Sequence, residues 1–82
     1  KISLTAGTYK TDENKPFILN CVRKAQELIV EKKMDHEYLG IEGLKSFVDN
    51  SLKVAYTDTN KKLQEGAIAG IQTISGTGAL YV

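Results

Sequence analysis

Residues 67–80 form the stretch of the sequence that most constrains what the chain can fold into. The stretch begins as an apolar run with several β-branched residues, continues through Ser75-Gly76-Thr77-Gly78, and resumes with Ala79-Leu80. An apolar run of this composition predicts a buried strand, and Ala79-Leu80 indicates the start of a helix. The sequence therefore predicts a strand, a tight turn and a helix start in immediate succession.

A strand, turn and helix in this order can hold a phosphate group. The first amides of a helix have no partners within the helix, and the positive end of the helix dipole faces the turn. Glycine lets the backbone approach an anion closely, and the hydroxyls of Ser75 and Thr77 add donors. The alternative is an ordinary strand-to-helix connection with a serine or threonine N-cap. The spacing alone favours this alternative, since short glycine-rich turns occur in many folds.

The length, charge and cysteine content of the chain limit the classes of protein to which it can belong. Eighty-two residues suffice for one small domain at most. The 11 Lys+Arg and 10 Asp+Glu nearly cancel, and no basic stripe predicts binding to nucleic acid or an anionic membrane. Cys21 is the only cysteine, which excludes a disulfide framework and favours a reducing compartment. No apolar run has the length of a membrane span, and no signal peptide is visible.

Both ends of the sequence look cut. The chain begins at Lys1 without a methionine and stops at Val82, just after a helix is predicted to begin, so we expect a segment of a longer protein. Residues 1–4 are predicted to be extended. The rest of the stretch to residue 15 is polar and turn-rich, and a loop of this length is often functional.

Two amphipathic helices are predicted between the ends. Pro16 is favourable in the first turn of a helix, and apolar residues recur after it at helical spacing, which predicts a helix over residues 16–32. A second periodic pattern predicts a helix over residues 41–57. Both helices are expected to serve burial, and Cys21 is expected to pack on the apolar side as a small hydrophobic residue.

The linker between the two predicted helices contains the only histidine, His36, and an aromatic residue, Tyr38. A His-Glu pair without a nearby cysteine or second histidine is a poor metal site, so no metal is expected. A role for His36 as a catalytic base needs a partner that the sequence does not show. The Tyr38 hydroxyl can reach beyond its own element, or the ring can fill the gap between the helices.

Four stretches of the sequence stand out as motifs when they are taken together. They are LTAGTYKTD (4–12) followed by Lys15-Pro16, VRKA (22–25), HEYL (36–39) followed by Ile41 and Gly43-Leu44, and QT (72–73) followed by SGTGAL (75–80). Any one of them alone would be a weak signal. In this order and at these separations, they resemble the motifs of the aspartate aminotransferase family.

The resemblance implies an α/β fold, of which this chain is expected to be a fragment. The family has the fold of type I pyridoxal-phosphate-dependent transferases, with a large domain and a mostly parallel sheet. This segment would supply two amphipathic helices and then a strand-turn-helix start. The implied cofactor is pyridoxal 5'-phosphate, and the implied assembly is a homodimer with active sites at the subunit boundary. The implied reaction of the full-length protein is transamination between L-aspartate and 2-oxoglutarate, giving oxaloacetate and L-glutamate.

The resemblance also assigns binding residues. The family turn that matches Ser75, Gly76 and Thr77 cradles the cofactor phosphate, and the tyrosine that matches Tyr38 reaches across the dimer to the phosphate of the neighbouring site. The glycine that matches Gly7 lies in a loop that closes over the substrate, and the residue that matches Ala6 lies beside it. The expected partners are amino acids and 2-oxo acids, with neither nucleic acid nor membrane, and the expected location is cytoplasmic, with a mitochondrial form as the alternative.

The sequence departs from the family at several positions. Threonine stands at position 5 where the family usually has glycine, Thr8 replaces alanine, Lys10 replaces arginine, and Gly40 replaces proline. The substitutions in the substrate loop leave the substrate preference open. A related class I aminotransferase of broader or aromatic specificity is therefore an alternative.

The residues that carry the family's chemistry lie beyond Val82. They are the lysine that forms a Schiff base with the cofactor, an acid for the pyridine nitrogen, an aromatic wall and the carboxylate-binding arginines. We assign no catalytic residue here and expect the 82 residues alone to be inactive. Two other classes remain: a stand-alone phosphate-binding module, although the lysine of nucleotide-binding loops is absent after Gly78, and a non-catalytic helical fragment.

Overall fold

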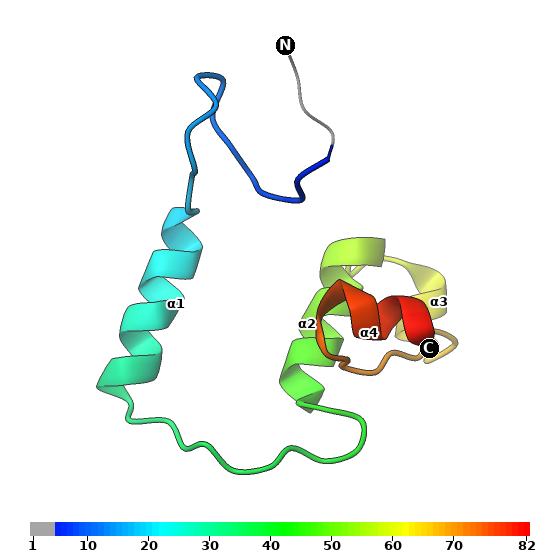
Figure 1. The fold of residues 1–82 in the computed structure, drawn as a ribbon. Helices are drawn as coiled ribbons and strands as arrows, with labels where there is room; N and C mark the ends of the chain where they lie inside the picture. Colours follow the sequence, from blue (N-terminus) through cyan, green and yellow to red (C-terminus); the bar gives the residue numbers. More distant parts are fainter. Residues whose placement is uncertain (1–4) are drawn as a thin grey trace. The chain divides into compact units, whose positions relative to one another are not determined.

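The structure, a computed structural model, describes residues 5–82, so the predicted extended segment at residues 1–4 lies outside the described residues. The chain divides into two compact units, Lys1–His36 and Glu37–Val82. The helices in the described part are α1 (Asn20–Glu31), α2 (Lys45–Tyr56), α3 (Lys61–Gln64) and α4 (Ser75–Tyr81) (Figure 1). Only α1 belongs to the first unit, and each unit is described by itself.

A tight turn precedes α1 in the first unit. Lys10 and Pro16 form an antiparallel bridge, and the Thr11 amide donates to the Lys15 carbonyl over 2.9 Å. Asn14 has φ 60°, a left-handed conformation that asparagine adopts more easily than most residues. Pro16 therefore lies in this turn, and its predicted place in the first turn of a helix is wrong.

α1 is shorter than the helix predicted over residues 16–32. It begins at Asn20 because Pro16 is part of the bridge and Leu19 is extended, with φ −60° and ψ 140°. None of its residues is buried and Cys21 is exposed, so the predicted packing of Cys21 is not found. An amphipathic helix buries its apolar face only against another element, and residues 5–36 contain no second helix.

α2 begins later than the helix predicted over residues 41–57. The Gly43 amide donates to the Gly40 carbonyl over 2.9 Å, and Gly43 has φ +85°. This left-handed turn cannot continue as a right-handed helix, so α2 begins at Lys45. It ends at Tyr56, after which Thr57 has φ 65°.

α2 packs against α3 and against the segment that follows α3. Asn60 caps α3, because its side-chain oxygen accepts from the Leu63 amide over 3.2 Å. Further along, the position that a Cβ would take at Gly70 lies 3.1 Å from Val48 Cγ1 and 3.5 Å from the Leu52 methyl carbons. A small apolar layer therefore forms on this side of α2.

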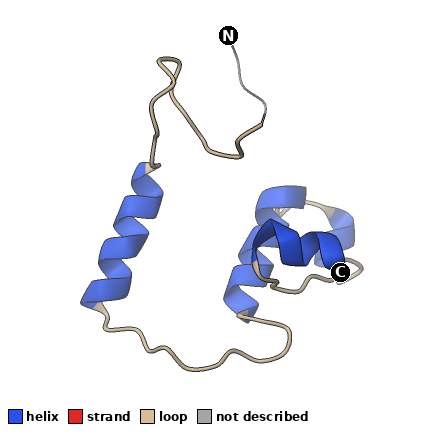
Figure 2. Ribbon diagram, in the orientation of Figure 1, coloured by secondary structure: helices blue, strands red, loops and turns tan. Residues whose placement is uncertain are grey.

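The strand predicted at the start of residues 66–82 is absent from the part of the chain that the structure describes (Figure 2). A strand requires a hydrogen-bonded neighbour, whereas the Gln72 amide donates to the Glu42 carbonyl over 3.0 Å. Ser75-Gly76-Thr77-Gly78 does not form a separate turn either, since α4 begins at Ser75 itself. Residues 5–82 are thus helix and loop, and they do not display the expected α/β arrangement.

Candidate functional site

The start of α4 carries the three residues predicted to hold a phosphate. Ser75, Gly76 and Thr77 are all exposed. The Gly78 amide makes the first bond of this helix, to the Ile74 carbonyl over 2.9 Å, so the three amides before it have no carbonyl of the helix to bond. Ile74 is the N-cap residue and its side chain makes no capping bond. The alternative of a serine or threonine side chain as the N-cap is therefore not what the structure shows.

The two glycines of this segment have different surroundings. A Cβ at Gly78 would lie 3.2 Å from Thr73 Cβ, so Gly78 permits the close approach of Thr73 to the helix. The Thr73 hydroxyl also donates to the Ser75 carbonyl over 3.2 Å. A Cβ at Gly76 would meet nothing within 4 Å. Thr73 therefore contacts one side of the segment. The side at Gly76 has no neighbour within 4 Å of a Cβ, so a ligand can approach it there.

Gln72 holds the segment before α4 to the start of α2. Its side-chain Oε1 accepts from the Leu44 amide over 2.8 Å, and its own amide donates to the Glu42 carbonyl over 3.0 Å. We call these two bonds, with Gly43 between their ends, the Gln72 clamp. The motifs that contain Gln72 and Gly43 do not predict this contact, although a glutamine within an otherwise apolar run is a signal for a specific partner.

Tyr38 belongs to the same unit as the start of α4, in the loop before the Gly40–Gly43 turn. Its side chain is 102% exposed, so the ring does not fill a gap between helices within its unit. The hydroxyl is accordingly available to a group outside this unit. Tyr38 therefore belongs to the same unit as Ser75, Gly76 and Thr77.

Ala6 and Gly7 belong to the other unit and are exposed. They lie in a stretch without regular secondary structure that ends at the bridge between Lys10 and Pro16. A Cβ at Gly7 would meet nothing within 4 Å, so no contact within the described chain requires glycine there.

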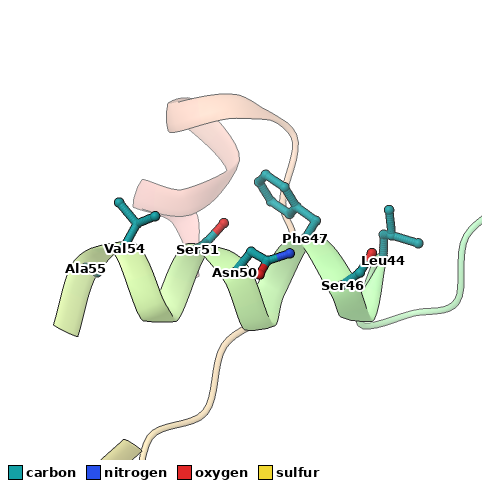
Figure 3. A pocket seen from close by; sticks show the side chains of 7 residues that line it. All are labelled: Leu44, Ser46, Phe47, Asn50, Ser51, Val54 and Ala55. Carbon is teal, nitrogen blue, oxygen red and sulfur yellow. The ribbon is translucent and has the colours of Figure 1, made fainter. Parts of the chain in front are cut away.

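Other features of residues 5–82 add no second site. No group of three His, Cys, Asp or Glu side chains among them could hold a metal ion, and none of their helices is long and apolar enough to cross a membrane. An open hollow of about 480 Å³ runs along α2, where Phe47 and Val54 stand out from the helix (Figure 3). It includes none of the predicted binding residues.

Comparison with known proteins identifies the class of protein. The family model for aminotransferase class I and II matches residues 1–82. The chain therefore belongs to the aminotransferase class I and II family.

Within this family the chain is similar to aspartate aminotransferases, as its motifs predicted. It is 44% identical to the mitochondrial aspartate aminotransferase of Gallus gallus and 42% identical to that of Dictyostelium discoideum, each over 82 residues. It is 39% identical over 83 residues to the cytoplasmic enzyme of Saccharomyces cerevisiae. Each comparison covers 100% of this chain but only 19–20% of the relative's length. The relatives include mitochondrial and cytoplasmic proteins, so the compartment of this one stays a prediction.

Proposed function

We propose that the full-length protein is an aspartate aminotransferase, which exchanges an amino group between L-aspartate and 2-oxoglutarate and gives oxaloacetate and L-glutamate. The observation that carries the proposal is the similarity to aspartate aminotransferases, which extends over the whole chain at 39–44% identity. The uncapped start of α4 supports it, because it offers donors where the family motif predicts a phosphate.

Pyridoxal 5'-phosphate is the proposed cofactor, and the donor set at the start of α4 fits its phosphate group. A phosphate is stabilised by several donors at once, and the amides of Ser75, Gly76 and Thr77 together with two hydroxyls supply them. When bound, this cofactor withdraws electrons from the substrate and carries the amino group between the two substrates. The proposed contribution of these three residues is to anchor the phosphate and so fix where the cofactor lies.

The other predicted residues have orienting roles in this proposal. The exposed Tyr38 hydroxyl would donate to the cofactor phosphate of a neighbouring subunit in a homodimer. The Gly7 amide would donate to a substrate carboxylate, with Ala6 in apolar contact beside it. The groups that move protons and clamp both substrate carboxylates are expected elsewhere in the protein, so these 82 residues alone are expected to be inactive.

Visible absorption of the full-length protein tests this function. We expect the purified protein to be yellow, to lose that colour when L-aspartate is added and to regain it with 2-oxoglutarate. Colourless protein that cannot be loaded with pyridoxal phosphate would contradict the proposal. A kcat/KM for phenylalanine equal to or above that for aspartate would support the alternative of aromatic or broader specificity, which Thr5 and Thr8 leave open.

Replacement of Thr77 tests the phosphate assignment. Thr77→Ala removes one donor to a charged acceptor, which we expect to weaken cofactor binding by about 1.5–3 kcal/mol. The matched control is Thr59→Ala, since the Thr59 hydroxyl lies 3.1 Å from that of Thr57 in the same unit, in the loop between α2 and α3. Cofactor titration of the two variants measures the difference, and equal affinities would remove Thr77 from the site.

A further inference from the structure

The Gln72 clamp joins two parts of the second unit that are far apart in sequence. Leu44 and Gln72 are separated by 28 residues, and the bond from the Leu44 amide to Gln72 Oε1 is 2.8 Å long. The bond from the Gln72 amide to the Glu42 carbonyl, 3.0 Å, adds a second attachment through the same residue. Two bonds on adjacent sides of one residue fix both its position and its orientation on the start of α2.

Because Gly43 has no side chain, it leaves room for Gln72 beside it. A Cβ at Gly43 would overlap Gln72 Cβ and would lie 2.7 Å from Gln72 Oε1. Gly43 also has φ +85°, a conformation that residues with a Cβ rarely adopt. Gln72 and Gly43 are both half-buried, in a chain whose described residues include no fully buried side chain.

Only two residues separate the clamp from the start of α4, and both are constrained. The Thr73 hydroxyl donates to the Ser75 carbonyl over 3.2 Å, and Thr73 Cβ packs against the backbone at Gly78. Ile74 accepts the first bond of α4. A displacement of Gln72 is therefore transmitted to the amides of Ser75, Gly76 and Thr77.

We propose that Gln72 is a positioning residue, which places the phosphate-binding start of α4 by clamping it to residues 42–44. The inference rests on the proposed function, since it assigns a role toward the cofactor phosphate. Gln72 does not touch the phosphate in this account. It fixes where the donors lie relative to residues 42–44, and loss of the clamp leaves donors that are present but misplaced.

The test compares a phosphorylated ligand with its unphosphorylated form on the full-length protein freed of cofactor. Gln72→Met keeps the shape of the side chain and removes the acceptor for the Leu44 amide. We expect it to weaken binding of pyridoxal phosphate and of inorganic phosphate about tenfold, while binding of pyridoxal, which lacks the phosphate, changes less than about twofold. The phosphorus NMR signal of bound pyridoxal phosphate should shift as well.

Gln64→Met is the matched control. Gln64 lies in the same unit and also makes one side-chain bond, from Nε2 to the Asp58 carbonyl over 3.1 Å, so the same change removes a bond that does not lead to α4. We expect its phosphate affinity and phosphorus signal to match those of the wild type. If Gln72→Met does not fold, Gln72→Asn, which draws the acceptor back from Leu44, is measured in its place.

The outcomes separate the two proposals. Equal weakening of pyridoxal and pyridoxal phosphate in the Gln72 variant, or no weakening at all, overturns the positioning role and leaves the proposed function intact. A wild-type protein that binds neither pyridoxal phosphate nor phosphate overturns the proposed function, and the positioning role with it. Selective loss of the phosphorylated ligand together with an unchanged control supports both.

Discussion

The two units of the chain differ in how far along the sequence their contacts reach. In Lys1–His36 the turn before α1 is held by near neighbours, such as the Phe17 amide and the Tyr9 carbonyl at 3.3 Å. In Glu37–Val82 the Leu44 amide bonds to Gln72, 28 residues further on. The second unit therefore has tertiary structure of its own, whereas the described part of the first consists of a local turn and a helix.

The two units also differ in how far their residues are shielded from solvent. Among residues 5–36 only Thr11 is partly shielded from solvent, whereas the second unit has a set of half-buried residues around α2. They are Gly43, Val48, Asp49, Leu52, Asn60, Leu63, Ile68, Gln72, Thr73 and Gly78. The comparison indicates that the proposed phosphate-binding residues are positioned by their own unit. The described part of the first unit gives no such support to the proposed substrate residues Ala6 and Gly7.

Replacing Gly43 and Gly7 with alanine is expected to give the largest difference in unfolding free energy between the two units. Gly43→Ala introduces a Cβ that overlaps Gln72 and strains a left-handed residue, which we expect to lower the free energy of unfolding by about 3 kcal/mol. Gly7→Ala places its Cβ in open space and should change it by less than about 0.5 kcal/mol. Urea denaturation of the full-length protein measures both. Similar losses at the two positions would break the comparison between the units.

A smaller effect is expected at the cap of α3. Asn60→Ala removes the acceptor for the Leu63 amide and should cost about 1 kcal/mol of unfolding free energy. Asn50→Ala is the control, since Asn50 is an exposed residue inside α2 and alanine favours a helix interior. We expect the control to be neutral or slightly stabilising. A loss there as large as at Asn60 would show that capping is not the cause.

The smallest global effect is expected in the first unit. Asn14→Ala strains the left-handed residue of the turn, at a local cost of about 1 kcal/mol, and Asn14→Gly should be neutral. Because the turn is held by near neighbours, the cost should appear as roughly fivefold faster hydrogen exchange of the Phe17 amide. The unfolding free energy should change by less than about 0.5 kcal/mol. A larger global loss would mean that the turn is coupled to structure beyond its own unit.

The sequence predicted the periodic helices better than the segments between them. Apolar spacing located the bodies of α1 and α2, but the starts depended on the bridge at Pro16 and the left-handed Gly43, which periodicity does not encode. α3 was not predicted, because a helix of four residues has no repeating pattern to detect. The strand prediction for residues 67–74 failed because apolar β-branched composition signals a strand only where a partner strand is present.

The candidate site shows the same limit. The sequence predicted Ser75, Gly76 and Thr77 in a turn just before a helix, whereas in the structure they are the first residues of α4, and no side chain caps this start. Gln72 was visible as part of a family motif and as one polar residue in an apolar run, but its bonds to residues 42–44 were not, since these partners are distant in the sequence. Contacts between distant segments arise from the fold, and no local pattern states which segments will meet.

The Gln72 clamp also restricts which substitutions the protein can accept over time. Gly43 and Gln72 occupy adjoining space, and a Cβ at position 43 would overlap the Cβ of Gln72, which every residue except glycine carries. Glycine at position 72 would remove that overlap, but it would lose the acceptor for the Leu44 amide and leave the strain of φ +85° at position 43. Position 43 is thus restricted twice, by volume and by backbone conformation. Position 72 is restricted only by the space beside Gly43 and by the need for an acceptor for the Leu44 amide. Substitutions are therefore expected to be tolerated more readily at position 72 than at position 43.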